Sequence, residues 1–323
     1  MYEKKIKPIV VISNCLEFKA CRYNGELIPN NFVKRLEPFV IYKPICPEIE
    51  IGLGVPRDPI KIVSKNDKQN MVQPSTGNDY TKMMNDFAIK FNDSLTEVDG
   101  FILKSRSPSC GIKDVNLYDK LNKGSQIGKT NGFFAKEVLK KFEGLAIEDE
   151  GRLTNHRIRE HFLTKLFLLA SFRHLKKKQS IAGLIKFHDV NKFILMSHNQ
   201  SKTRELGNMI ASYNNNTPED IFNNYEEKLK IAIRSVARKS SNINMFMDLF
   251  GYFSKYLNSN EKAIFLDNIE KNRNNKIPIS SILILLKSWI SKYEHKYLME
   301  QTFFSPYPEE LMNICDSAKG RES

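Results

Sequence analysis

GFILKSRSPSCG, residues 100–111, joins a short apolar run to a turn that carries a single cysteine. The run GFIL has the length and composition of a buried strand, and the Ser-Pro-Ser sequence before Cys110 and Gly111 is typical of a rigid turn. Cys110 therefore follows directly after a predicted strand. A disulfide, a nucleophile, a metal ligand and a buried structural thiol all remain open for it at this point.

Two further cysteines follow predicted strands in the same way. PIVVIS (8–13) ends just before Cys15, and FVIYKPI (39–45) ends just before Cys46. The loops after the strands of a parallel sheet lie along one edge, so these three thiols can meet there. Three thiolates at one point repel one another without a cation. Convergence therefore indicates a metal centre of zinc, copper(I) or iron–sulfur type, and buried structural cysteines are the alternative.

The first 125 residues alternate strand-like and helix-like segments. Apolar residues recur at helical spacing over 79–95, with Asp79 placed to cap that helix, and PIKIVS (59–64) adds a candidate strand. This alternation predicts an α/β domain with a mainly parallel sheet over residues 1–125.

The pattern changes after the Gly-, Lys- and Asn-rich loop 120–132. Residues 133–323 show helical periodicity and no convincing strand, which predicts a second, all-α domain. Segment 181–213 is expected to form one long helix that carries His188 and His198. Ten residues place these two histidines on different sides of a helix, which favours a structural role over a second metal site.

Composition limits the function classes. The net charge is +13, and residues 126–323 hold 31 of the 50 basic residues against 22 of the 37 acidic ones. This excess fits contact with RNA or another polyanion, or simply a solvated helix surface. Five irregularly spaced cysteines do not form a disulfide framework, which favours a reducing cytoplasm. No apolar run approaches the roughly 20 residues that span a bilayer, so we expect no membrane segment.

Four segments of the N-terminal part, in the same order, resemble the motifs of the bacterial thiouracil desulfidases. The remainder of the chain resembles the helical half of YbgA-like proteins, in which the same two parts are fused. The N-terminal motifs are SNCLEFKACRYNG (13–25), CPEIEIGLGVPRDP (46–59), TGNDYT (76–81) and GFILKSRSPSCG (100–111). The C-terminal ones are FFAKEVLKKFEGLAIEDEGRLTNHRIREHF (133–162) and FHDVNKFILMSHNQSKTRELG (187–207).

The resemblance implies an iron–sulfur site. Its family binds a 4Fe–4S cluster through three cysteines, which correspond here to Cys15, Cys46 and Cys110, and leaves one iron open for the thiocarbonyl sulfur of the substrate. By the same resemblance Glu48 is the general acid/base, and Ser107 supplies a hydroxyl that orients substrate or relays a proton.

Other residues beside these motifs are candidates with alternatives. Ser109, Arg57 and Lys104 are predicted substrate contacts, although structural ion pairing explains the two cations equally well. Cys21 is expected to pack near the cluster without binding it. Glu17 stands where many relatives have glycine, and we expect it to reshape the pocket. Cys315 is expected to have no role in the site.

Together these observations predict iron–sulfur-dependent, non-redox desulfidation of a thiolated pyrimidine, with a helical accessory domain over 133–323. The small-molecule substrate, or a tRNA that carries the thiolated base, is left open. The alternative from a different class is a non-catalytic metal- or cluster-bearing protein that binds nucleic acid through its basic helical half.

Overall fold

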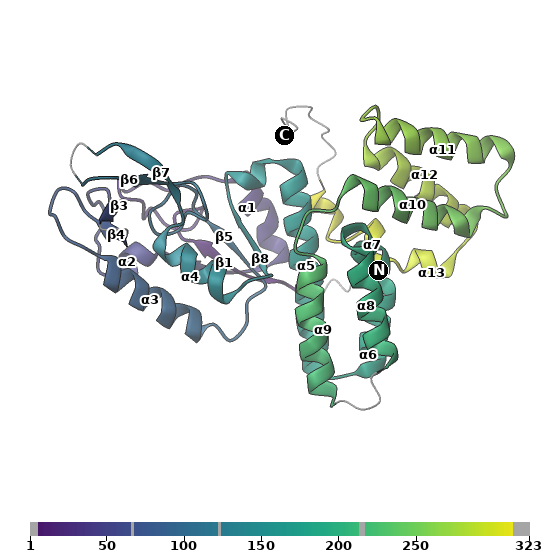
Figure 1. Cartoon of the computed structure of the whole chain (residues 1–323), viewed down its shortest axis with the longest axis horizontal. Helices are drawn as coiled ribbons and strands as arrows, with labels where there is room; N and C mark the ends of the chain where they lie inside the picture. The colour runs from purple at the N-terminus through teal and green to yellow at the C-terminus, as the bar shows by residue number, and fades with distance from the viewer. Residues whose placement is uncertain (1–5, 66–67, 122–123, 213–216, 313–323) are drawn as a thin grey trace. The chain divides into compact units, whose positions relative to one another are not determined.

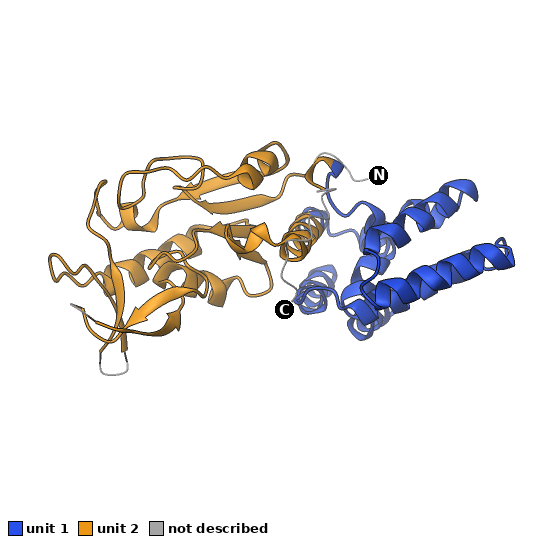
Figure 2. Cartoon of the chain, turned by 90° about the horizontal axis from the view of Figure 1, so that it is seen from above, with its two compact units in different colours: residues 1–4, 171–309 blue, residues 5–170, 310–323 orange. Residues whose placement is uncertain are grey.

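The computed structural model describes residues 6–65, 68–121, 124–212 and 217–312 (Figure 1). The chain divides into two compact units, residues 5–170 with 310–323 and residues 1–4 with 171–309 (Figure 2). Within the described part of the chain, no helix is long and apolar enough to cross a membrane.

The unit that contains residues 5–170, orange in Figure 2, is built on a sheet of four strands in the order β2-β1-β5-β8, all parallel. Its two central strands are buried along almost their whole length, which is why their sequences IVVIS and GFIL are continuously apolar rather than alternating. This confirms the predicted α/β domain with a parallel sheet. The strands are β1 (Ile9–Ser13), β2 (Ile41–Ile45), β5 (Gly100–Leu103) and β8 (Ala146–Asp149).

Strand β8 contradicts the expectation that residues 133–323 contain only helices. Its sequence AIED is short and half acidic, so local propensity gives little indication of a strand. Pairing with β5, from Gly100 opposite Ala146 to Leu103 opposite Asp149, holds it in the sheet. Non-local pairing of this kind leaves no periodic signal in so short a segment.

A second sheet with the order β4-β3-β6-β7 was not expected from the sequence. The candidate strand at 59–64 exists as β3, but it belongs to this mixed sheet and not to the parallel one. Strand β7 lies inside the segment 120–132 that was interpreted as a loop. The bounds are β3 (Lys61–Lys65), β4 (Lys68–Val72), β6 (Val115–Tyr118) and β7 (Gln126–Thr130).

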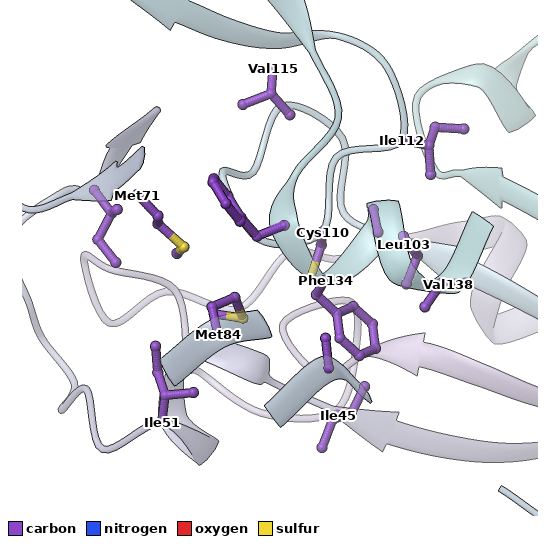
Figure 3. Packing of buried hydrophobic residues seen from close by; sticks show 14 of the residues in the cluster. Ile45, Ile51, Met71, Met84, Leu103, Cys110, Ile112, Val115, Phe134 and Val138 are labelled. Carbon is purple, nitrogen blue, oxygen red and sulfur yellow. The ribbon is translucent and has the colours of Figure 1, made fainter. Parts of the chain in front are cut away.

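Two helices of this unit, α3 (Thr81–Ser94) and α4 (Phe133–Lys141), pack on each other through aromatic side chains. The ring of Phe134 lies 5.8 Å from that of Phe91 and belongs to the same buried cluster as Cys110 (Figure 3). The N-cap of α3 is Tyr80 and not Asp79, yet Asp79 still accepts the first helical N–H, from Thr81.

The unit that contains residues 171–309, blue in Figure 2, is helical in its described residues, as the sequence predicts for this region. Segment 181–213 is not one helix, however, because the chain breaks at Asn191 and Asn199, and Asn199 caps the helix that follows. His188 and His198 therefore lie on different helices. The helices are α5 (His156–Lys178, across the unit boundary), α6 (Ile181–Val190), α7 (Lys192–His198), α8 (Gln200–Ala211), α9 (Pro218–Ala232), α10 (Lys239–Phe253), α11 (Ser259–Arg273), α12 (Ile279–Lys292) and α13 (Lys296–Met299).

Both histidines have structural partners. His188 Nδ1 lies 3.0 Å from the Tyr225 hydroxyl, and His198 Nδ1 lies 2.9 Å from the Ile194 carbonyl oxygen. Burial lowers the pKa of His188, which favours its neutral form. His188 thus joins α6 to α9 and His198 bonds within its own helix α7, and both contacts favour a structural role over a second metal site.

Substitution of Gly100 by alanine tests the close approach of β5 and β8. A Cβ atom there would lie 2.6 Å from the Ala146 carbonyl oxygen and 2.8 Å from Leu166 Cδ1. We expect Gly100→Ala to lower the free energy of unfolding by about 1–3 kcal/mol in urea titrations, the cost of overpacking. Gly128→Ala, in β7 with no atom within 4 Å of the added carbon, is the matched control and should change it little. Equal stability of both variants would contradict this packing.

Candidate functional site

The parallel sheet brings the three predicted cysteine positions to one edge. Cys15, Cys46 and Cys110 follow β1, β2 and β5, and the backbone N–H of Asn14 donates to the Ile45 carbonyl oxygen at 2.8 Å, which ties the first two strand ends together. Cys15 and Cys110 are buried and Cys46 is half-buried. The thiols thus lie where parallel sheets place their ligands.

Cys21 is a fourth thiol of this group. Its side chain is 1% exposed, its thiol interacts with those of Cys15 and Cys46, and its carbonyl oxygen lies 3.9 Å from Cys46 Sγ. Cys46 in turn interacts electrostatically with Cys110. The four cysteines therefore form a continuous series of neighbours, in the order Cys15, Cys21, Cys46, Cys110. Cys315 lies outside the described residues.

The pKa values of three of these thiols are raised, which favours their protonated form in the absence of a metal. The hydrogen bond to Cys15, together with burial, raises the pKa of Cys21 to about 11. The hydrogen bond to Cys21 and burial raise the pKa of Cys46 well above its ordinary value, and burial raises that of Cys110 to about 12. A metal that binds thiolate must displace these protons, so binding releases protons and strengthens as pH rises.

A single-ion site is absent from the part of the chain that the structure describes, because no three His, Cys, Asp or Glu side chains there could hold one metal ion. An iron–sulfur cluster needs its ligands in a different arrangement. Each of its cysteines binds a different iron, so their sulfurs stand farther apart than the ligands of one ion. Four buried or half-buried thiols without nearby histidine fit a soft iron–sulfur group better than a harder cation.

Glu48 is the carboxylate beside these thiols. Cys46 is the N-cap of the short helix α2 (Pro47–Glu50), and Pro47 at its first position is pre-set for the turn that places Glu48. Arg57 donates from Nε at 2.8 Å and from Nη2 at 2.6 Å to Glu48 Oε2. The side chains of Glu48 and Arg57 are 11% and 6% exposed, so this is a buried two-bond ion pair.

Two serine hydroxyls contact the other carboxylate oxygen of Glu48. The Ser109 hydroxyl donates to Glu48 Oε1 at 2.7 Å and lies 3.7 Å from Cys110 Sγ. Ser107 Oγ lies 2.9 Å from Ser109 Oγ and 3.4 Å from Glu48 Oε1, and it is less buried than Ser109. Each hydroxyl has one hydrogen to give. Because that of Ser109 is taken by Glu48, the hydrogen bond between the serines runs from Ser107 to Ser109.

The loop that carries these serines is held by residues that the sequence analysis missed. The N–H groups of Phe133 and Ala135, at the start of α4, donate to the Pro108 and Ser109 carbonyl oxygens at 3.0 Å each. Gly132 allows this approach, since a Cβ there would lie 2.5 Å from Ser109 O. Glycine directly before an apolar helical run was the available signal.

Lys104 points to a different set of partners. Its ammonium contacts a carboxylate oxygen of Glu150 and lies 2.9 Å from Ser105 Oγ. Glu150 also accepts the Ser105 N–H at 2.7 Å. Glu48, Arg57, Ser107 and Ser109 therefore form one network, and Lys104 belongs to a neighbouring one that fixes the end of β5.

The backbone conformation at Glu17 is one that glycine adopts most easily. The φ of Glu17 is +74°, in the left-handed region that favours glycine. The carboxylate accepts the Asn30 N–H and lies 3.3 Å from Lys34 Nζ, at the start of α1 (Asn31–Leu36). It is thus engaged by this helix start and not by the Glu48 network.

Two family models match this chain, one in its N-terminal part and one in its C-terminal part. Residues 10–150 match the family model described as 2-thiouracil desulfurase, and residues 192–308 match DUF1722, described as a protein of unknown function. The chain is therefore similar to the 2-thiouracil desulfurase family in its first part and to DUF1722 in its second. The first covers all the site residues described above, from Cys15 to Glu150.

Individual relatives match between about a third and a half of this chain. The chain is 24% identical to the uncharacterized protein YbgA of Escherichia coli K12 over 163 residues, 50% of this chain and 96% of that protein. It is 28% identical to the uncharacterized protein YbbK of Bacillus subtilis 168 over 110 residues, 32% of this chain and 73% of that protein. A solved structure of the [4Fe-4S]-dependent thiouracil desulfidase TudS matches at 23% identity and a TM-score of 0.34, over 46% of this chain and 94% of that one.

The buried Glu48–Arg57 ion pair can be tested by its coupling energy. Arg57→Met leaves the Glu48 carboxylate buried without its cation, and we expect a loss of about 3–5 kcal/mol in the free energy of unfolding. Adding Glu48→Gln to Arg57→Met should restore most of this loss. Lys141→Met breaks an exposed pair with Asp93 and should cost less than about 1 kcal/mol. A double variant as unstable as the sum of the single ones would contradict the coupling.

Proposed function

We propose that this protein removes sulfur from thiolated pyrimidines by iron–sulfur-dependent, non-redox desulfidation, with water as the oxygen donor. The observation that carries the proposal is the shared position of Glu48 and the thiols: Ser109 contacts Glu48 Oε1 and Cys110 Sγ at the same time. The match of residues 10–150 to the 2-thiouracil desulfurase family supports the substrate class. The named activity of TudS is in agreement.

Cys15, Cys46 and Cys110 would hold a 4Fe–4S cluster, one thiolate to each of three irons. When bound, such a cluster with an open iron supplies a Lewis acid and an acceptor for the thiocarbonyl sulfur. The overall reaction exchanges the thiocarbonyl sulfur for the oxygen of water and releases sulfide, so it needs no electron donor. Cys21 is not assigned as a ligand.

Glu48 would serve as the acid/base. Its Oε2 is held by Arg57 and its Oε1 faces the serines, so Oε1 is the atom that takes a proton from attacking water and returns one to the departing sulfur. The hydroxyls of Ser109 and then Ser107 continue the hydrogen-bond chain from this oxygen atom toward the less buried side of the site. We assign Ser107 to substrate orientation or proton relay, and Ser109 to the link between substrate and Glu48.

The two basic residues divide between roles. Arg57 spends two N–H groups on Glu48 and donates from Nη1 to the Cys21 carbonyl oxygen at 3.2 Å, so its main task is to orient the carboxylate. Contacts of Arg57 and Lys104 with substrate stay predictions. The DUF1722 domain would present the substrate, and its basic excess suits a nucleotide or a thiolated tRNA as well as a free base.

An anaerobic assay tests the proposal. Protein reconstituted with iron and sulfide is incubated without reductant in ¹⁸O-labelled water, with 2- and 4-thiouracil, their nucleotides, or thiolated tRNA. We expect a brown protein that releases sulfide and places labelled oxygen in the pyrimidine. A full cluster with no sulfide release from any of these substrates would reject the function. A colourless protein with salt-sensitive RNA binding would favour the non-catalytic alternative.

Substitutions at two neighbouring positions separate chemistry from assembly. Glu48→Gln keeps the thiols and should retain the cluster's absorbance while turnover falls by roughly 10²–10⁴, the usual contribution of a positioned acid/base. Cys46→Ala should lose cluster and activity together. Iron content and sulfide release, measured on the same samples, distinguish the two. Near-native turnover of Glu48→Gln with a full cluster would transfer proton handling to Ser107.

A further inference from the structure

Cys21 is a buried thiol that the proposed reaction does not use. Its thiol interacts with the thiols of two cysteines, Cys15 and Cys46, that are themselves proposed ligands. Its backbone is held as well, because its carbonyl oxygen accepts from Arg57 Nη1 at 3.2 Å and lies 3.9 Å from Cys46 Sγ. These contacts hold the segment of Cys21 beside the Cys46 thiol in the cluster-free site.

Exposure distinguishes the four cysteines of the site. Cys15, Cys21 and Cys110 are buried, and Cys46 is half-buried. A small oxidant in solution therefore reaches the Cys46 sulfur first when no metal covers it. Oxidation of a thiol follows its thiolate character as well as its accessibility, and the raised pKa of Cys46 opposes the reaction at neutral pH, so accessibility is the property that distinguishes Cys46. A second thiol placed next to the first captures the oxidised sulfur before it reacts further.

We propose that Cys21 is the resolving thiol of the cluster-free site and forms a reversible disulfide with Cys46. The oxidant is hydrogen peroxide. The Cys46 sulfur attacks one peroxide oxygen, the O–O bond breaks, and a sulfenic acid and one water form. The Cys21 sulfur then attacks the Cys46 sulfur, the S–O bond breaks, and a second water leaves. Two thiols lose two electrons and two protons, and the peroxide is reduced to two waters.

The consequence is protection of a ligand. A disulfide at Cys46 prevents cluster loading until a dithiol reductant reopens it, whereas the sulfinic and sulfonic acids that form without a resolving thiol are irreversible. The inference rests on the proposed function only where it takes Cys46 as a ligand. The disulfide itself depends on the thiol geometry alone.

The test uses the cluster-free, full-length chain with Cys315→Ser, so that only the site cysteines remain. After peroxide treatment, peptide mapping of the protein with its native site should show a Cys21–Cys46 disulfide and the loss of two hydrogens. Dithiothreitol should then restore its full capacity to bind iron. Cys21→Val, of similar volume, and Cys21→Ala should instead gain two or three oxygens at Cys46 and lose most of that capacity.

Three results would overturn the inference: Cys21 still free after peroxide treatment, a disulfide between other cysteines, or equal recovery of iron binding with and without Cys21. The mapping on the native site needs neither Cys21 variant to fold. It also needs no activity, so an active desulfidase without this disulfide rejects only the inference. An inactive protein that forms the disulfide rejects only the proposed function.

Discussion

The site depends on the parallel pairing of β1 with β2 on one side and β5 on the other. Because the three strands run in the same direction, the residues that follow Ser13, Ile45 and Leu103 emerge at one edge of the sheet. Lys104 N–H donates to Ser13 Oγ at 2.8 Å, which joins the ends of β1 and β5 by a side chain as well as by the ladder. Cysteines separated by up to 95 positions in the sequence thereby become neighbours. A register slip in β1 would turn its alternate side chains away and remove this contact.

Charge in this buried edge is balanced mainly by Arg57. The side chain of Glu48 is only 11% exposed and lies beside Cys46 and Cys110, both of which would be negative as ligands. A carboxylate in that setting requires a cation, and the planar guanidinium meets it with two N–H groups where a lysine would offer a point charge. The same guanidinium binds the Cys21 carbonyl oxygen. One residue thus holds both the proposed acid/base and the segment that carries the fourth thiol.

Strand ends were predictable from the sequence because buried central strands are continuously apolar, and the cysteines follow them directly. The role of Arg57 could not be predicted, since a guanidinium can bind either a substrate or a carboxylate of the protein. Only the structure shows that Arg57 contacts Glu48, nine positions earlier in the sequence. Strand β8 and the second sheet were missed for a related reason: their short, polar segments become strands through pairing with distant partners. Asn191 and Asn199 interrupt a helical pattern that periodicity alone continues. Glu17 was noticed as a departure from glycine, but only the backbone φ explains it.

The hydroxyl hydrogens of Ser13, Ser107 and Ser109 are donated to different acceptors in the site. Each serine has a single hydrogen to donate, and the contacts assign all three. Ser13 accepts the Lys104 N–H, which leaves its hydrogen for the Cys110 sulfur, whose pKa this bond lowers against the effect of burial. Ser109 gives its hydrogen to Glu48 at 2.7 Å, with Ser107 behind it, and its oxygen lies 3.7 Å from the Cys110 sulfur, whose pKa it also lowers. Ser13 thus serves the Cys110 thiol, whereas Ser109 connects that thiol to Glu48, so a change in the charge of Cys110 acts directly on the hydroxyl that faces Glu48.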